Sequence, residues 1–143
     1  MCLKLCENEK NGIIINNLQL ESYIHLHYPK YHFISSTTKC LKEKDTKNEL
    51  NNTKYKLICL DYNLNNNWDF LNSLSQEEIN KCELLCNAIC PPNCPDRQHH
   101  YFLNGLYSLS YGNPYEQLPH CQAYKYNNVC KITRNFKTHI SPQ

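Results

Sequence analysis

The alternation of apolar and polar segments is the feature that most constrains the fold of this chain. Four short apolar runs, at 12–15, 31–34, 55–60 and 82–87, are separated by segments with helical patterns. Such alternation is typical of β/α units, whose strands form a parallel sheet. The sequence therefore predicts an α/β fold with four parallel strands.

The segments between the runs contain signals for helices. Asn17 is a suitable N-cap for a helix that ends at Pro29, and Ser75 with Glu78 predicts a capping box. Further helices are expected near 45–51, within 65–74 and over 97–107. The apolar face of the first helix is expected to consist of Leu20, Tyr23, Ile24 and either Leu26 or His27.

Each apolar run becomes polar where it ends. The polar ends are Asn16–Asn17, Ser35–Thr38, Asp61–Asn63 and Asn87 with the residues after it. The carboxyl ends of parallel strands meet at one edge of the sheet, where barrels and open α/β enzymes place their sites. This pattern predicts a functional edge, with Asn87 as a candidate cofactor-binding residue. The alternative interpretation is that polar residues simply begin each loop.

Length and charge restrict the class of protein. The 143 residues fit one domain, with β/α units over about 11–87 and an irregular cysteine-rich loop, helix and tail over about 88–143. A formal charge of +2 without a clustered basic face does not support nucleic-acid binding. No segment approaches the roughly 18 apolar residues of a membrane span, and the first residues lack a secretory signal. A cytoplasmic location is therefore expected.

Ten cysteines in a reducing compartment need an explanation other than disulfides. Cys90 and Cys94 lie in a proline-rich loop, Ile-Cys-Pro-Pro-Asn-Cys-Pro, directly after the fourth run, and the prolines stiffen it. Thiolates suit zinc or iron–sulfur clusters, and Cys121 and Cys130 could complete a set of four ligands. The three-residue spacing is not that of common zinc or ferredoxin motifs, so free thiols or a redox pair remain alternatives. Other candidate ligands nearby are His99, His100 and His120, whereas Cys82 and Cys86 are interpreted as small core residues.

Three further residues are candidates for catalysis. Arg97 keeps its charge and can hold a carboxylate, a phosphate or the negative charge of a cluster. His100 titrates near neutrality or serves as a ligand, and Asp61 is a candidate acid/base group at the end of the third run. The alternatives are surface or capping roles for Arg97 and His100, and a loop-fixing role for Asp61.

Four stretches together resemble a known family. They are Asn11–Asn17, Ile34–Lys39, Cys59–Asn67 and Cys90–Tyr101, the last reading Cys-Pro-Pro-Asn-Cys-Pro-Asp-Arg-Gln-His-His-Tyr. The chain resembles an uncharacterised family of bacterial barrel proteins, which is similar to the collagenase-like "peptidase" barrels, several of them iron–sulfur hydroxylation proteins. The resemblance runs from about Leu5 to the final Ile140-Ser-Pro.

The resemblance implies about half of a TIM-like (β/α) barrel, because family members are about twice as long. It matches Cys90, Cys94 and Cys121 to recurring cysteines, and Arg97, His100 and Tyr101 to the family's Arg and His-Tyr, with Tyr101 as a candidate cofactor-binding residue. Cys130 has no counterpart.

The leading hypothesis is a metal- or iron–sulfur-binding barrel protein of unknown substrate, and in one version of it the chain is a fragment of a longer oxidoreductase-like or modification protein. A structural zinc-binding module and an inactive truncated remnant are the alternatives. Open apolar sheet edges predict self-association or a second chain that completes the barrel. No Gly-rich phosphate loop or nucleophile elbow supports nucleotide binding or hydrolysis.

Overall fold

A computed structural model describes residues 2–86 and 92–108, and within it four strands form one sheet. The strands are β1 (Gly12–Ile15), β2 (His32–Ser35), β3 (Tyr55–Cys59) and β4 (Cys82–Glu83). Their order in the sheet is their order in the chain, and every neighbouring pair is parallel. The prediction of an α/β fold with a four-stranded parallel sheet is confirmed. In the described part of the chain the sheet is open, not closed into a barrel.

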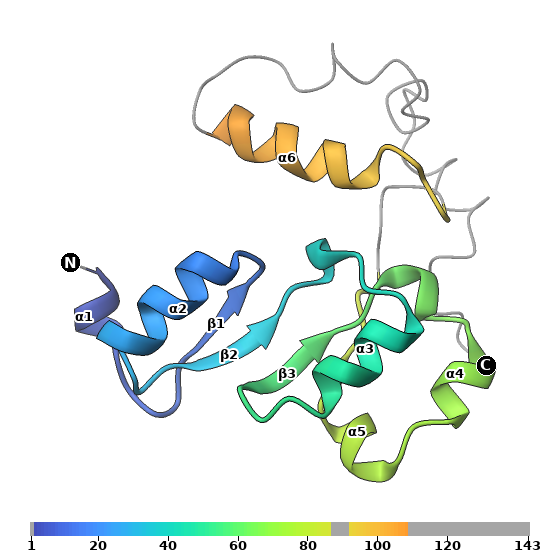
Figure 1. Cartoon of the computed structure of the whole chain (residues 1–143), viewed down its shortest axis with the longest axis horizontal. Helices are drawn as coiled ribbons and strands as arrows, with labels where there is room; N and C mark the ends of the chain where they lie inside the picture. The colour runs from blue at the N-terminus through green and yellow to red at the C-terminus, as the bar shows by residue number, and fades with distance from the viewer. Residues whose placement is uncertain (1, 87–91, 109–143) are drawn as a thin grey trace.

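Helices connect the strands as the sequence predicts (Figure 1). The Asn17 side chain accepts a hydrogen bond from the Leu20 amide at 2.9 Å, and the Ser75–Glu78 capping box is complete. The helices are α1 (Cys2–Cys6), α2 (Leu18–His27), α3 (Glu43–Leu50), α4 (Trp68–Asn72), α5 (Gln76–Asn80) and α6 (Arg97–Ser108), with 3₁₀ turns η1 (Thr37–Lys39) and η2 (Tyr62–Leu64).

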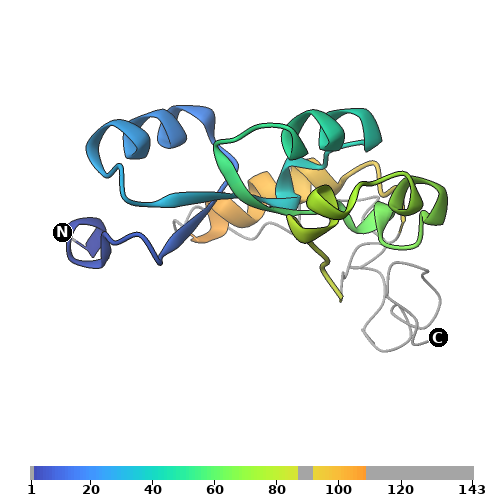
Figure 2. The same cartoon turned by 90° about the horizontal axis from the view of Figure 1, so that it is seen from below.

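The core lies on one face of the sheet, which α2 and α3 cover together (Figure 2). It joins strand residues to the helices and to the segment that follows β3. Its buried members are Ile15, Ile24, Tyr31, Phe33, Leu50, Tyr55, Ile58, Leu60, Leu64, Phe70 and Leu74. On the opposite face Ile14, Ile34 and Leu57 lie in register, with Ile14 exposed and the other two half-buried. The sheet therefore has one well-covered face in the described residues.

The predicted apolar face of α2 is wrong in most of its members. The helix buries Ile24 together with Glu21, whereas Leu20, Tyr23 and Leu26 are exposed. The physical reason is a hydrogen bond, because the Tyr55 hydroxyl of β3 donates to the Glu21 carboxylate at 2.5 Å. The hydrogen-bonded Glu21 carboxylate thus occupies an inward position where the apolar pattern predicts a hydrophobic side chain.

The fourth strand is shorter than the predicted run 82–87, and Cys86 is exposed rather than part of the core. The β3–β4 ladder ends early because the chain after β3 leaves the sheet. Its last hydrogen bond runs from the Leu60 amide to the Glu83 carbonyl, and η2 then begins at Tyr62. Cys82 agrees better with its prediction, since it is half-buried and packs against the core. Asn87 lies outside the described residues.

None of the helices in the described part of the chain combines the length and the apolar character needed to cross a bilayer.

Candidate functional site

The polar ends of the first three strands meet at one edge of the sheet. Asn16, after β1, donates from Nδ2 to the Thr38 hydroxyl at 2.9 Å. Thr37, after β2, donates to the Leu60 carbonyl beyond β3 at 3.0 Å. The expectation that these ends share the carboxyl edge is confirmed for β1, β2 and β3.

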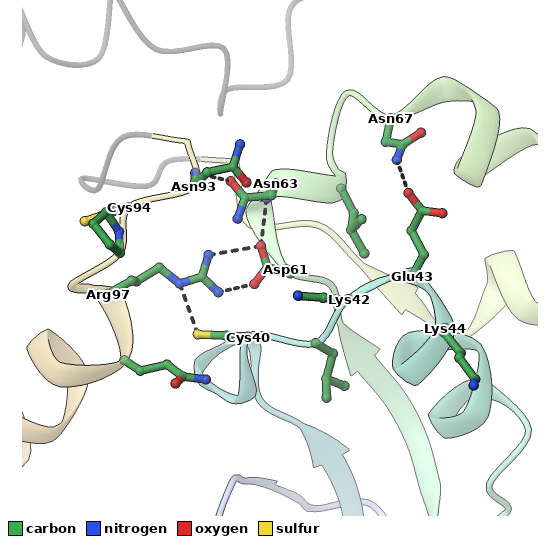
Figure 3. Close-up of a pocket in the computed structure, with 14 residues that line it drawn as sticks. Cys40, Lys42, Glu43, Lys44, Asp61, Asn63, Asn67, Asn93, Cys94 and Arg97 are labelled. Carbon is green, nitrogen blue, oxygen red and sulfur yellow. Dashed lines mark hydrogen bonds and ion pairs between the residues drawn. The ribbon is translucent and has the colours of Figure 1, made fainter.

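A cleft of about 670 Å³ opens at this edge (Figure 3). Three segments line it: the one after β2, the one after β3, and the turn that leads into α6. In Figure 1, α6 lies across the carboxyl end of the sheet. The lining residues are Cys40, Leu41, Lys42, Glu43, Lys44, Asp61, Asn63, Leu64, Asn67, Asn93, Cys94, Pro95, Arg97 and Gln98. A cavity of this size, at the carboxyl ends of parallel strands, is large enough for a small molecule.

Asp61 and Arg97 form a buried, bidentate ion pair in the wall of the cleft. Arg97 is 4% and Asp61 5% exposed, and Nη1 donates to Oδ1 at 3.0 Å while Nη2 contacts Oδ2. The Arg97 guanidinium also lies over the Tyr62 ring, 4.2 Å from its centroid. Burial alone lowers the pKa of Arg97, but hydrogen bonds and charge from Asp61 and Tyr62 raise it above its ordinary value. Arg97 is therefore a charged interior residue rather than a surface one.

Asp61 has two structural tasks at once. Besides pairing with Arg97, its Oδ1 accepts the Asn63 amide at 2.9 Å and caps η2. The loop-fixing role expected as an alternative for Asp61 is therefore present, together with an ion pair that joins α6 to the end of β3.

Cys40 is a residue of the site that the sequence interpretation missed. Arg97 Nε donates to Cys40 Sγ at 3.1 Å, and both residues line the cleft. Cys40 has a left-handed backbone, with φ of 54°, at the end of η1. Burial raises the pKa of its thiol more than Arg97 lowers it, so Cys40 is a neutral thiol at pH 7. Cys40 lies two residues beyond the polar end expected for the second run, and its contact with the distant Arg97 gives no local signal.

Cys94 lies at the cleft, as its position after the fourth run predicts. It is half-buried and packs with Leu85 against Tyr62. The Asn93 amide before it donates to Asn63 Oδ1 at 3.0 Å, which ties this turn to η2. The other predicted ligands, Cys90, Cys121 and Cys130, lie outside the described residues. Within 2–86 and 92–108, no three His, Cys, Asp or Glu side chains gather as a metal site.

His100 and Tyr101 lie on the first turns of α6. His100 is buried, and its amide donates to the Asp96 carbonyl at 2.8 Å. Tyr101 is half-buried and lines a second hollow of about 610 Å³ with Asn16, Thr38 and Lys39. Its ring centroid is 5.7 Å from the Arg97 guanidinium. His99, the neighbouring candidate ligand, is exposed, and His120 lies outside the described residues.

The lowered pKa values of two histidines predict how stability depends on pH. Burial lowers the pKa of His100, and burial with the charge of Lys56 lowers that of His32. The unfolded chain therefore binds these protons more readily, so the free energy of unfolding falls as pH drops below about 6.5. Each group contributes at most about 1.4 kcal/mol per pH unit.

Chemical denaturation between about pH 7.5 and about pH 5.5 measures this dependence. We expect His100→Gln and His32→Gln each to give a shallower slope than wild type, and the double variant the shallowest. An unchanged slope in the double variant would contradict this assignment.

The fold and the cleft define an α/β protein with a parallel sheet and a small-molecule-sized cleft at its carboxyl edge. No protein-family model, curated protein or solved structure matches this chain. The resemblance to the barrel family stays a prediction from the quoted motifs.

Proposed function

We propose that this chain is a partial (β/α) barrel that holds a thiolate-ligated metal centre beside the carboxyl-edge cleft. The observation that carries the proposal is the position of Cys94, which lines the cleft at the edge where the strand ends meet. In this proposal Cys90, Cys94 and Cys121 are ligands, and Cys130 completes the set.

The chemistry of the proposed donors fits iron–sulfur and zinc. Both accept four thiolates, and an iron–sulfur cluster is the first choice because of the motif around Cys90 and Cys94. Hydrogen bonding around Cys94 favours a fixed ligand, since the turn that carries it is anchored by the Asn93–Asn63 contact.

The cleft supplies room for a small molecule next to the proposed centre. Asp61 and Arg97 are proposed to position the bound molecule, because their charges already neutralise each other in the ion pair. His100 has a lowered pKa and is neutral at pH 7, so it suits the role of a proton acceptor or ligand better than that of a cation. Asn87 and Tyr101 are proposed to contact the cofactor or the bound molecule.

A second candidate, a structural zinc site in a binding module, is favoured by the packing of Cys94. The thiol contributes to a small apolar cluster with Tyr62 and Leu85, as a structural ligand would. In that case the metal fixes the residues before α6 to the end of the sheet, and no reaction takes place in the cleft.

Metal content of the protein purified without oxygen tests the proposal. We expect a brown protein that contains iron and sulfide, and we expect Cys94→Ser to lose most of both because one ligand is missing. Cys6→Ser is the matched control, since Cys6 is exposed on α1 and does not line the cleft, so it should keep the wild-type content.

The outcomes separate the candidates. A colourless protein with about one zinc that Cys94→Ser loses supports the structural module. A wild-type protein with neither metal, or equal content in all three proteins, contradicts a thiolate centre at Cys94.

A further inference from the structure

The exposed apolar side chains of the described residues are concentrated at one edge of the sheet. Of the ten large apolar residues that are exposed there, six belong to α1, β1 and α2. They include Ile14 at 65% and Leu26 at 75% exposure. The six, which we call the β1-edge patch, are Leu5, Ile14, Leu18, Leu20, Tyr23 and Leu26. Exposed apolar side chains gathered on neighbouring elements are typical of an interaction site.

Among the residues that the structure describes, no strand pairs with the outer side of β1. The carbonyls of Asn11 and Ile15 accept amides of the β2 segment, so the odd-numbered residues face β2. Because backbone groups alternate along a strand, Gly12 and Ile14 direct their amides and carbonyls outward. No charge or proline interrupts Gly12-Ile-Ile-Ile, so the strand lacks the side chains that commonly protect an edge. The β4 edge differs, with two residues that include Glu83.

One flank of α2 continues this edge. Glu21 reaches Tyr55 of β3, which fixes the side of the helix that faces the middle of the sheet. On a helix of 3.6 residues per turn, Leu20 and Tyr23 lie on the other side of the inward Ile24. They therefore face away from β3, toward the open side of β1.

Charge distinguishes α2 from α3, the other helix on the same face of the sheet. Glu21 is the only formally charged residue of α2, and it is buried. By contrast, the sequence of α3, Glu-Lys-Asp-Thr-Lys-Asn-Glu-Leu, carries five charges. A two-fold interface brings only the residues near its axis close to their own copies, so like charges at its centre are unfavourable. The α2 flank has none.

We propose that the β1-edge patch is the docking surface for a second copy of this chain. A two-fold axis normal to the sheet sets β1 antiparallel to its copy and joins the two sheets into one of eight strands. The same axis places the two α2 helices side by side, because both lie on the same face. The occupant must supply an open apolar strand edge and an uncharged apolar helix flank, and the chain itself carries both.

Sedimentation equilibrium of the full chain tests this interface. We expect wild type to be a dimer, and we expect Tyr23→Glu to shift the equilibrium to monomer because it buries an unpaired charge in the interface. Ile14→Pro removes an outward amide and leaves the β1–β2 ladder intact, so it should weaken the dimer at least tenfold. Ile79→Glu is the matched control on α5, where a similarly exposed apolar residue lies outside the patch.

Circular dichroism and thermal unfolding establish that each variant is folded. Dimeric wild type and Ile79→Glu with monomeric Tyr23→Glu and Ile14→Pro support the proposal. Monomeric wild type, a dimer that persists in both patch variants, or a dimer that Ile79→Glu disrupts would overturn it. The result is independent of metal content, so it does not depend on the proposed metal centre.

Discussion

Replacing Arg97 with alanine is expected to lower the free energy of unfolding by about 3–5 kcal/mol. The variant leaves the Asp61 carboxylate, which is 5% exposed, without the guanidinium that neutralises it. It also removes the hydrogen bond to Cys40 and the contact with the Tyr62 ring. Urea denaturation followed by circular dichroism measures the loss.

Two further variants identify the ion pair as the cause. Arg97→Lys keeps the charge but cannot form the bidentate contact, so it should recover only part of the loss. Asp61→Ala combined with Arg97→Ala should cost clearly less than the sum of the single variants, because neither charge is then left alone. A loss below about 1 kcal/mol in Arg97→Ala would show that the pair contributes little.

Lys39→Met is expected to have an effect of similar size, about 3–5 kcal/mol. The Lys39 ammonium lies 2.6 Å from a Glu49 carboxylate oxygen and 2.9 Å from the Tyr55 hydroxyl. Both charged side chains are largely buried, at 9% and 18% exposure. Methionine preserves most of the volume of the side chain, so the loss reports the stranded Glu49 carboxylate rather than a cavity. Ser35, which also donates to Glu49, compensates for one hydrogen bond only.

Lys54→Met is the matched control for this variant. Lys54 contacts Glu21 at 3.7 Å, but its side chain is 56% exposed. Glu21 is buried but keeps its hydrogen bond from Tyr55, and a long contact to an exposed lysine contributes about 0–1 kcal/mol, so the same substitution should have a small effect at this position. Equal losses in the two variants would mean that burial of the Lys39 pair is not the source of its strength.

The strands could be predicted because their signal is local. Gly12–Ile15 and Tyr55–Cys59 are apolar runs between polar residues, and their parallel arrangement follows from the helices between them. The inward face of α2 could not be predicted in the same way. Which side of α2 is buried depends on the contact between Glu21 and Tyr55, which are 34 residues apart. The periodicity of the helix does not reveal that partner.

The site shows the same division between local and distant information. Asp61 and Arg97 were identifiable as candidates by their residue type and by their positions at the end of a strand and the start of a helix. Their contact could not be predicted, because the two residues are 36 positions apart in the sequence. Cys40 was missed because its importance comes from Arg97, 57 residues later. The short β4 was missed because it depends on where β3 turns away, not on its own apolar residues.

The order of the strands in the sheet has a consequence for synthesis on the ribosome. Since β1, β2, β3 and β4 are neighbours in chain order, each new strand pairs with one that has already emerged. The nascent chain can therefore build its sheet progressively from the amino end, with short loop closures that favour fast folding. Arg97 emerges after all four of the described strands, so its contact with Asp61 can form only after the sheet has been synthesised.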